Sequence, residues 1–351
     1  MSNSTGQVEP RQTMARDEKI DILRFIGLAM IILAHTDPSP LIAQIRNFDV
    51  PLMVLVSGAS FALSYRYEAF TSYLWKRIKR LVFPTWIFLT VYFAVIFATN
   101  FPIVAPGIKT VIGSYILLSG IGYVWIIRVF LLVALVSPFI LKFSNSTKSH
   151  ATFFSVTAAI YIAYEIILFI TKSFSESPIR TMFENTVLYV IPYAILFAIG
   201  LRLTQLSKQH MINFMMVAFA VCVTVGAILW NASGTLVLTQ EFKYPPSIYY
   251  LSYALAVSLF LWLISDRIVT AVKQLGIYEP VMFIAQNTIW IYLWHIPLIE
   301  IINLEFYIKY PIVFALASCI AFVQIYLVKK VLIPRLSSQS NIRNVNYLLT
   351  G

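Results

Sequence analysis

The segment LRFIGLAMIILAHTDPSP, residues 23–40, places an arginine and a histidine near the two ends of an apolar run. The ten residues between Arg24 and His35 carry no charge, which is typical of a helix that crosses a membrane. Charged and titratable side chains are costly in such a helix, so they usually serve a purpose there. This stretch therefore predicts a transmembrane helix and leaves the role of its two polar residues to be explained.

The composition of the whole chain agrees with a membrane location. Of its 351 residues, 59% are hydrophobic and only 12% are charged, whereas a soluble domain has about 25% charged residues. The net charge of +11 does not indicate a nucleic-acid partner, because the basic residues gather in short loops on alternate sides of apolar runs. We therefore expect an integral membrane protein that binds no nucleic acid.

Apolar runs long enough to cross about 30 Å of hydrocarbon recur along the chain. They predict an all-α bundle of about ten transmembrane helices. Polar residues 1–18 are expected to form a disordered tail, and no cleavable signal peptide is visible there. Residues 19–335 are expected to form the transmembrane domain, and residues 336–351 are expected to form a second tail. The predicted spans cover 20–37, 48–65, 81–99, 122–141, 151–171, 186–203, 211–230, 247–265, 281–301 and 310–331.

The positions of Lys and Arg predict the orientation of the bundle. If the N-terminus is cytoplasmic, eighteen of the twenty-six basic residues fall in the inner loops and tails. Short cytoplasmic loops carry such an excess in membrane proteins. Both termini are therefore expected in the cytoplasm.

Arg24 and His35 are expected to share one face of the first helix. They are eleven residues apart, which is about three helical turns and roughly 16 Å along the axis. Asp21 precedes Arg24 by three residues and can pair with it. The structural alternative is that Arg24 is an interfacial anchor and His35 a hydrogen-bonded histidine at a helix end. Their common face favours a functional pair.

A basic segment follows the second span, in the predicted loop YRYEAFTSYLWKRIKRLVFPTW, residues 65–86. The preference for basic cytoplasmic loops explains the number of its charges. It does not explain arginine at both positions 77 and 80, which lie on one side of a helical turn. Arginine grips phosphate through two parallel hydrogen bonds. The functional interpretation is a phosphorylated ligand on the cytoplasmic side.

Deeper inside the predicted spans lie the ionisable residues Arg128, Glu165, His295 and Glu300. The alternating directions of the spans place all four in the outer half of the membrane, near the depth of His35. Ionisable groups at such depth usually face a protein interior or a wet cavity and mark a site. A structural ion pair between Arg128 and Glu165 is the alternative.

These residues belong to motifs that resemble the membrane acyltransferase 3 family. The resemblance covers nearly the whole chain in the family's order, and its most specific features are the Arg-x10-His pair, the Arg-x-x-Arg pair and YLWHIP. The motifs are DILRFIGLAMIILAH (21–35), FDVPLMVLVSGASF (48–61), RIKRLVFP (77–84), YVWIIRVFLLVALVSP (123–138) and IAQNTIWIYLWHIPLI (284–299).

The resemblance implies a bacterial enzyme of the plasma membrane that O-acetylates glycans. Its donor would be cytoplasmic acetyl-CoA, and no metal is expected. Its acceptor would be a hydroxyl of a surface glycan, such as O-antigen, capsule or exopolysaccharide, or of the lipid-linked precursor.

The resemblance also implies roles for individual residues. His35 is expected to act as a general base or a transient acyl carrier, with Arg24 essential on the same helix. Arg77 and Arg80 would engage acetyl-CoA, and we expect the neighbouring Lys76 and Lys79 to assist. Candidates for acceptor binding or for support of His35 are Asp21, Arg128, Glu165, His295 and Glu300.

Two alternatives belong to other functional classes. A transporter would also have many spans and buried charges, but no internal repeat that would indicate duplicated halves is visible. A non-catalytic membrane protein of glycan assembly would tolerate replacement of His35. Cys222 and Cys319 lie in separate apolar runs and receive no function, and the oligomeric state stays open.

Overall fold

A computed structural model describes residues 17–99, 103–118 and 120–350 of the chain. These residues form helices and short connections, with one isolated bridge between Lys243 and Pro246. The long helices are α1 (Glu18–Ala34), α3 (Asp49–Ser64), α4 (Phe70–Ala98), α6 (Trp125–Ser146), α7 (His150–Thr171), α8 (Pro178–Leu203), α9 (Lys208–Ser233), α10 (Ile248–Gln274) and α13 (Phe306–Leu327). The shorter helices are α2 (Pro40–Ile45), α5 (Ile108–Tyr115), α11 (Tyr278–Gln286), α12 (Thr288–Ile301) and α14 (Gln339–Leu349).

Eight helices in the described part of the chain are long and apolar enough to cross a membrane. The protein is therefore a multi-pass, all-helical membrane protein, as the sequence predicted. The two other predicted spans correspond to α1, which has 17 residues, and to the pair α11 and α12. The total of about ten spans and the cytoplasmic location of the termini stay predictions. Residues 1–16 lie outside the described residues, so disorder there also stays a prediction.

The span predicted for residues 281–301 is wrong in one respect, because the helix is interrupted. Asn287 separates α11 from α12 and adopts a non-helical backbone conformation. Its amide Nδ2 donates to the carbonyl of Phe283 at 2.6 Å. Asparagine competes in this way with the backbone bonds of a helix. Interrupted helices are tolerated within membranes where they line a cavity, and Gln286 and Thr288 beside the break do so here.

The basic segment before the third predicted span is helical, although the sequence predicted a loop. Helix α4 begins at Phe70 and continues for 29 residues. No proline or glycine interrupts residues 70–83, so the apolar span extends back through the basic residues without a break. Arg77 and Arg80 consequently lie on a rigid helix and not on a mobile loop.

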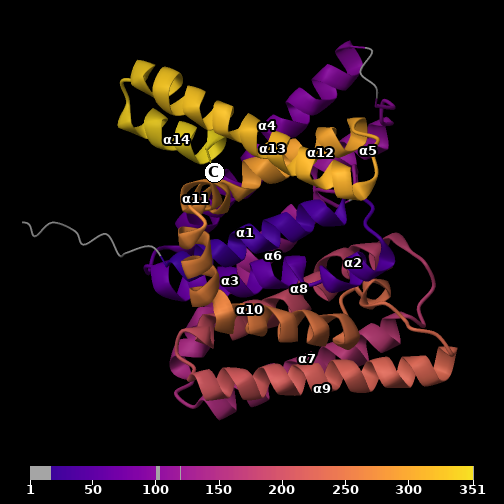
Figure 1. Ribbon diagram of the computed structural model, residues 1–351. Coiled ribbons are helices and arrows are strands. Elements are labelled where there is room, and N and C mark those ends of the chain that lie inside the picture. The colour runs from indigo at the N-terminus through magenta and orange to yellow at the C-terminus, as the bar shows by residue number, and fades with distance from the viewer. Residues whose placement is uncertain (1–16, 100–102, 119, 351) are drawn as a thin grey trace, which may run out of the picture.

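Helix α1 lies near the centre of the bundle and packs against α3, α10, α11, α12 and α13. Figure 1 shows it between the flank formed by α7 and α9 and the opposite flank formed by α13 and α14. Leu23 and Ile32 on this helix are fully buried. The outer helix α9, in contrast, buries only Ala218, as expected for an apolar helix that faces lipid. The fold therefore places the Arg24 and His35 helix where several others can contribute to a site.

Helices α3 and α8 approach very closely at two glycines. A Cβ atom at Gly58 would lie 2.2 Å from the carbonyl oxygen of Phe197, and one at Gly200 would lie 2.0 Å from that of Leu55. Small residues permit such close packing of helices in membranes. This contact fixes α3, which carries one wall of the site.

Candidate active site

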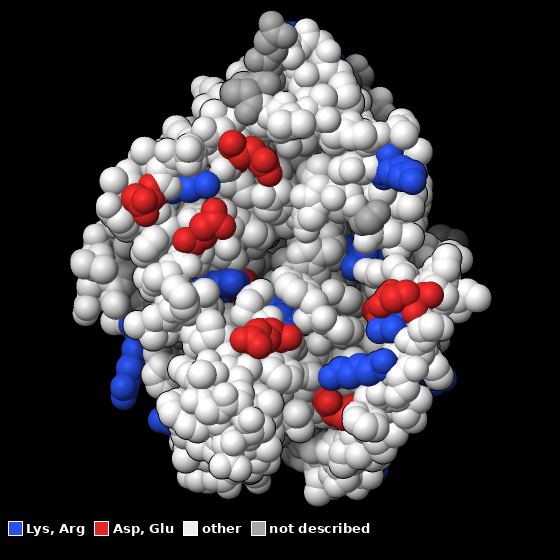
Figure 2. Space-filling model, turned by 90° about the vertical axis from the view of Figure 1, so that its right-hand side faces the viewer, with Lys and Arg blue, Asp and Glu red and all other residues white. Residues whose placement is uncertain are grey.

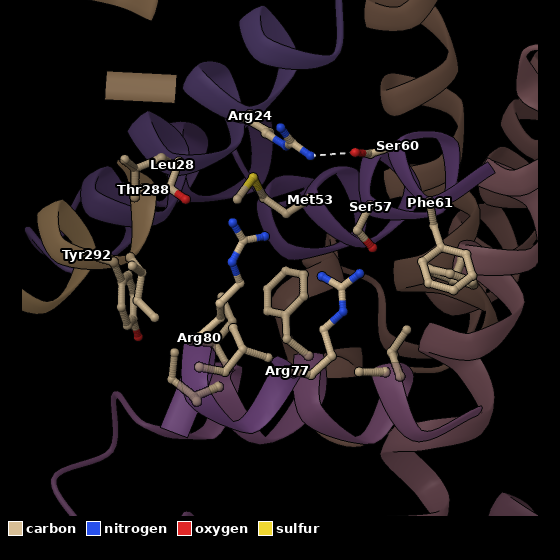
Figure 3. Close-up of a pocket in the computed structure, with 18 of the residues that line it drawn as sticks. Arg24, Leu28, Met53, Ser57, Ser60, Phe61, Arg77, Arg80, Thr288 and Tyr292 are labelled. Carbon is tan, nitrogen blue, oxygen red and sulfur yellow. Dashed lines mark hydrogen bonds between the residues drawn. The ribbon is translucent and has the colours of Figure 1, made fainter. Parts of the chain in front are cut away.

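A cavity of about 460 Å³ lies between α1, α3, α4, α6, α11 and α12, and we call it the inner cavity. Arg24 of α1 lines one side of it, and Arg77 and Arg80 of α4 line the other. Figure 3 shows the three guanidinium groups directed toward the space between these helices. The fold thus joins two sequence motifs that are about fifty residues apart in one positively charged site.

Hydrogen bonds hold Arg24 at the wall of the inner cavity. Its Nη1 donates to Asp21 Oδ1 at 3.1 Å, and its Nη2 donates to Ser60 Oγ at 2.8 Å. Asp21 is buried, so this ion pair belongs to the protein interior. The pairing of Asp21 with Arg24 is the one that the sequence predicted. Hydrogen bonds to α1 and to α3 therefore hold the Arg24 cation in a fixed position at the cavity wall.

Arg77 and Arg80 are held by aromatic rings. The guanidinium carbon of Arg77 lies 5.1 Å from the ring centre of Tyr73, and that of Arg80 lies 5.0 Å from the ring centre of Tyr347. Within the described ranges, neither arginine forms an ion pair with a carboxylate. Stacking leaves the edge of a guanidinium group able to donate to an anion. The two side chains are thus suited to binding phosphate.

The two lysines predicted to assist do not line the inner cavity. Lys76 pairs with Glu68 on the surface. Lys79 donates to Asn344 Oδ1 of α14 at 3.1 Å and lies over the Trp75 ring. The two lysines of α4 therefore contact residues outside the inner cavity, whereas the two arginines face the cavity.

A second cavity of about 150 Å³ lies beyond the inner one, and we call it the outer cavity. His35 lines it together with residues from the start of α3, the start of α6 and the segment 240–244. Ile31, Ile126 and Tyr292 line both cavities, so these three side chains form the wall between them. Arg24, Leu28, Ile31 and His35 follow one another along a single face of α1, as the sequence predicted for its two polar members.

His35 is paired with His295, a residue that the sequence offered as a candidate support. Nδ1 of His35 lies 2.8 Å from Nε2 of His295, and the two rings are stacked 19° from parallel. Nδ1 of His295 in turn contacts the backbone carbonyl of Tyr292. His295 is fully buried, which fixes the geometry of this chain of contacts.

For two neutral rings, the hydrogen-bond contacts assign the nitrogen that carries each proton. A carbonyl oxygen only accepts, so Nδ1 of His295 must donate to Tyr292 and its Nε2 must be the unprotonated nitrogen. This Nε2 can then only accept, so Nδ1 of His35 donates to it. Nε2 of His35 is left with its lone pair. A lone pair of this kind can take a proton from a hydroxyl group or attack a carbonyl carbon.

Tyr123 connects His35 with Glu300, another predicted candidate. The ring of Tyr123 meets that of His35 edge to face at 5.0 Å. Its hydroxyl donates to Glu300 Oε1 at 3.0 Å, and its carbonyl accepts from the hydroxyl of Tyr292. Glu300 therefore touches the site through Tyr123 and does not contact His35 itself.

Arg128 and Glu165 do not form the ion pair that was the alternative for them. Nη1 of Arg128 donates to the carbonyls of Leu117 and Leu118 at 2.9 and 2.6 Å, which anchors the turn after α5. Glu165 accepts from the Tyr161 hydroxyl at 2.7 Å. Neither residue lines the inner or the outer cavity. The structure does not bring these two candidates to the site.

The outer cavity also contains charges that the sequence interpretation missed. They are Arg46 and Lys243, which both contact Asp49. The sequence does contain a signal for these two residues. Both lie in predicted outer loops, where the positive-inside rule does not account for basic residues. Their separation by almost two hundred residues hid their proximity.

One of the comparisons with known proteins identifies the family of this chain. A family model described as an acyltransferase domain, that of acyltransferase family 3, matches residues 17–329. The match begins just before α1 and ends after α13, so it includes every helix that lines the two cavities. No curated protein and no solved structure gives a significant match. Since the matched region covers most of the chain, the protein belongs to the membrane acyltransferase 3 family.

Proposed function

We propose that this membrane acyltransferase transfers an acetyl group from cytoplasmic acetyl-CoA to a hydroxyl of a cell-surface glycan or of its lipid-linked precursor. The observation that carries the proposal is the arrangement of the two cavities along one face of α1. A cavity with three arginines leads toward one that contains a histidine with an available lone pair. Donor and acceptor can thus approach His35 from opposite ends.

In this account the inner cavity binds the donor. The phosphates of CoA lie against Arg77 and Arg80 near its mouth, with Arg24 deeper along the path. The pantetheine arm extends past the hydroxyl-bearing face of α3, where Ser57, Ser60 and Ser64 line the cavity. The thioester reaches His35 once the side chains of Ile31, Ile126 and Tyr292, which separate the two cavities, move aside.

The chemical step uses Nε2 of His35. As the acceptor oxygen attacks the thioester carbonyl carbon, Nε2 takes the hydroxyl proton, the carbon–sulfur bond breaks and CoA leaves as a thiolate that regains the proton. His295 keeps the required tautomer and stabilises the protonated ring of His35. In the other version of the step, Nε2 attacks the thioester first and carries the acetyl group to the hydroxyl.

The test uses membrane vesicles that contain the full chain, radiolabelled acetyl-CoA and endogenous glycan. Native protein should move label into the glycan fraction, and His35→Ala should not, although it should still bind acetyl-CoA. Labelled protein trapped without acceptor would identify the acyl-histidine version. Label transfer by His35→Ala at the native rate would refute the proposal, and solute uptake without any transfer would favour a transporter.

A further inference from the structure

The outer cavity contains a buried group of charges with two cations and one anion, which we call the Arg46–Asp49–Lys243 cluster. Asp49 Oδ2 accepts from Arg46 Nη1 at 2.8 Å, and its Oδ1 lies 3.2 Å from Lys243 Nζ. The relative exposures of the three residues are 5%, 1% and 2%. The cluster is therefore almost completely desolvated and carries one positive charge in excess.

Neighbouring polar groups hold the cluster rigidly but do not neutralise it. Arg46 Nη2 contacts Gln240 Oε1 at 3.4 Å. Asn47 and Gln44 bond to Thr239, at 2.9 Å in each case, and so join α2 to the segment that carries Lys243. In the part of the chain that the structure describes, no other carboxylate lies within ion-pair distance of Arg46 or Lys243, and Nε of Arg46 has no hydrogen-bond partner.

Stability does not account for this arrangement. Desolvation of a charge costs several kcal/mol, and a buried ion pair often contributes less than a well-packed apolar pair. An excess buried cation is costlier still unless an anion joins it. The orientation of the helices does not account for it either, since Arg46 and Lys243 belong to predicted outer loops. An excess cation at a cavity wall is, however, suited to binding an anionic ligand.

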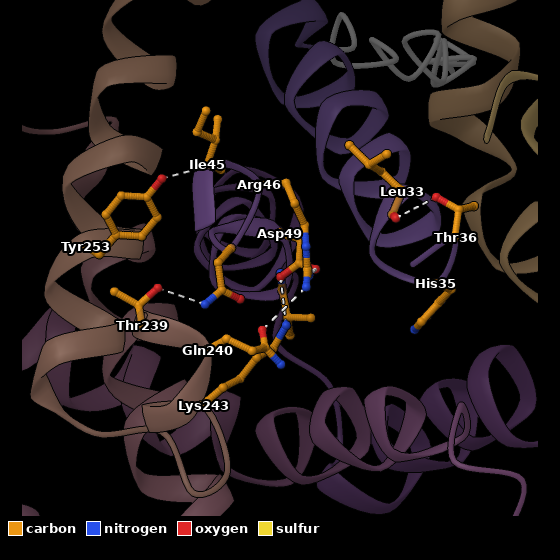
Figure 4. A network of polar contacts seen from close by, with 12 residues as sticks. Leu33, His35, Thr36, Ile45, Arg46, Asp49, Thr239, Gln240, Lys243 and Tyr253 are labelled. Carbon is orange, nitrogen blue, oxygen red and sulfur yellow. Dashed lines mark hydrogen bonds and ion pairs between the residues drawn. The ribbon is translucent and has the colours of Figure 1, made fainter. Parts of the chain in front are cut away.

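The cluster faces the same space as the proposed catalytic group. Figure 4 shows His35 extending from the end of α1 toward the region of Arg46, Asp49 and Lys243. Trp125 and Tyr244 also line this cavity, with their rings edge to face at 5.3 Å, and Tyr244 is half exposed. Figure 2 views the protein from the side on which α1 ends and shows a central hollow bordered by charged side chains.

We propose that the Arg46–Asp49–Lys243 cluster binds an anionic group of the acceptor, a carboxylate or a phosphate, and so directs a neighbouring hydroxyl toward Nε2 of His35. This inference rests on the proposed function, because it takes a sugar as the acceptor. The acceptor would then be an acidic sugar or a sugar linked to phosphate, and Trp125 and Tyr244 would contact the face of its ring. The donor phosphates would remain at the separate arginines of the inner cavity.

The test measures ligand binding and does not depend on acetyl transfer. Dissociation constants are obtained by saturation-transfer NMR for the full chain in lipid nanodiscs with methyl β-glucuronide, glucose 1-phosphate and the neutral methyl β-glucoside. The native protein should bind at least one anionic probe about tenfold more tightly than the glucoside, as a charge-assisted bond predicts. A preference for the glucuronide indicates an acidic sugar, and a preference for glucose 1-phosphate a phosphate-linked one.

Variants show whether the cluster is responsible. Lys243→Gln leaves a neutral Arg46–Asp49 pair and should reduce the preference to about twofold or less, while Lys243→Arg should retain it. Lys172→Gln removes an exposed cation at the end of α7, outside both cavities, and should change nothing. Equal affinity for all three probes, including no measurable binding of any, would overturn the inference, as would a preference that survives Lys243→Gln. Failure of the proposed function would appear separately, as absence of acetyl transfer.

Discussion

At the scale of single residues, the account depends on the tautomer of His35. His295 fixes it by accepting from Nδ1 at 2.8 Å while its own Nδ1 contacts the carbonyl of Tyr292. His295→Leu removes the acceptor and should lower kcat about 100-fold, within the range that a positioned base contributes. The KM for acetyl-CoA should stay unchanged, because His295 does not line the inner cavity.

His295→Gln provides the control for this prediction. Its amide oxygen can accept from Nδ1 of His35, so part of the lost rate should return. Rates of CoA release by the purified variants decide the matter. Equal rates for the leucine and glutamine variants would show that His295 does not act through the tautomer.

A second residue-scale prediction concerns the donor. Arg77→Ala and Arg80→Ala should each raise the KM for acetyl-CoA about tenfold or more, since a hydrogen bond to a charged group contributes about 1.5–3 kcal/mol. Lys76→Ala is the matched control on the same helix, because Lys76 pairs with Glu68 outside the cavity. Steady-state kinetics of the three variants measure the effect. A larger KM change for Lys76→Ala than for the arginine variants would contradict the assignment.

At the scale of elements, α14 lies beside the proposed donor site although it follows the matched family region. It packs against α4, and the ring of Tyr347 lies 5.0 Å from the guanidinium carbon of Arg80. A partly exposed contact of this kind contributes about 0.5–1 kcal/mol. Tyr347→Ala should therefore raise the KM for acetyl-CoA about two- to fivefold. Tyr347→Phe keeps the ring and should behave as the native chain, and identical kinetics for both variants would exclude the role.

The contact of α3 with α8 gives a prediction about stability. A methyl group at Gly200 would lie 2.0 Å from the carbonyl oxygen of Leu55, so Gly200→Ala must push the two helices apart. Overpacking typically costs about 1–3 kcal/mol. The midpoint of thermal unfolding in detergent should fall clearly below that of the native chain. Gly107→Ala, at a position with nothing within 4 Å, is the control, and an equal midpoint for both variants would contradict the packing argument.

At the scale of the whole molecule, the sequence predicted those features that depend on local pattern. The length of the apolar runs predicted the helical membrane class. Helical periodicity predicted that Arg24 and His35 share a face and that Asp21 pairs with Arg24. The start of α4 and the break at Asn287 were missed because an apolar window does not reveal how far a helix continues or where a side chain interrupts it.

Long-range contacts could not be predicted in this way. The approach of His295 to His35 joins residues 260 positions apart, and that of Lys243 to Asp49 joins residues 194 apart. Such proximity depends on how α1, α3, α10 and α12 pack, which no single segment specifies. Expected depth in the membrane made His295 one of several candidates for the support of His35, and it equally proposed Arg128 and Glu165, which line neither cavity.

The central claim is that His35 transfers acetyl groups to a glycan, and proton NMR of O-acetyl groups tests it most directly. Surface glycans are compared from cells that lack the protein and from the same cells supplied with the native chain or with His35→Ala. The account predicts acetyl signals only with the native chain, while both chains reach the membrane in equal amounts. Acetyl signals of equal intensity with His35→Ala would contradict it.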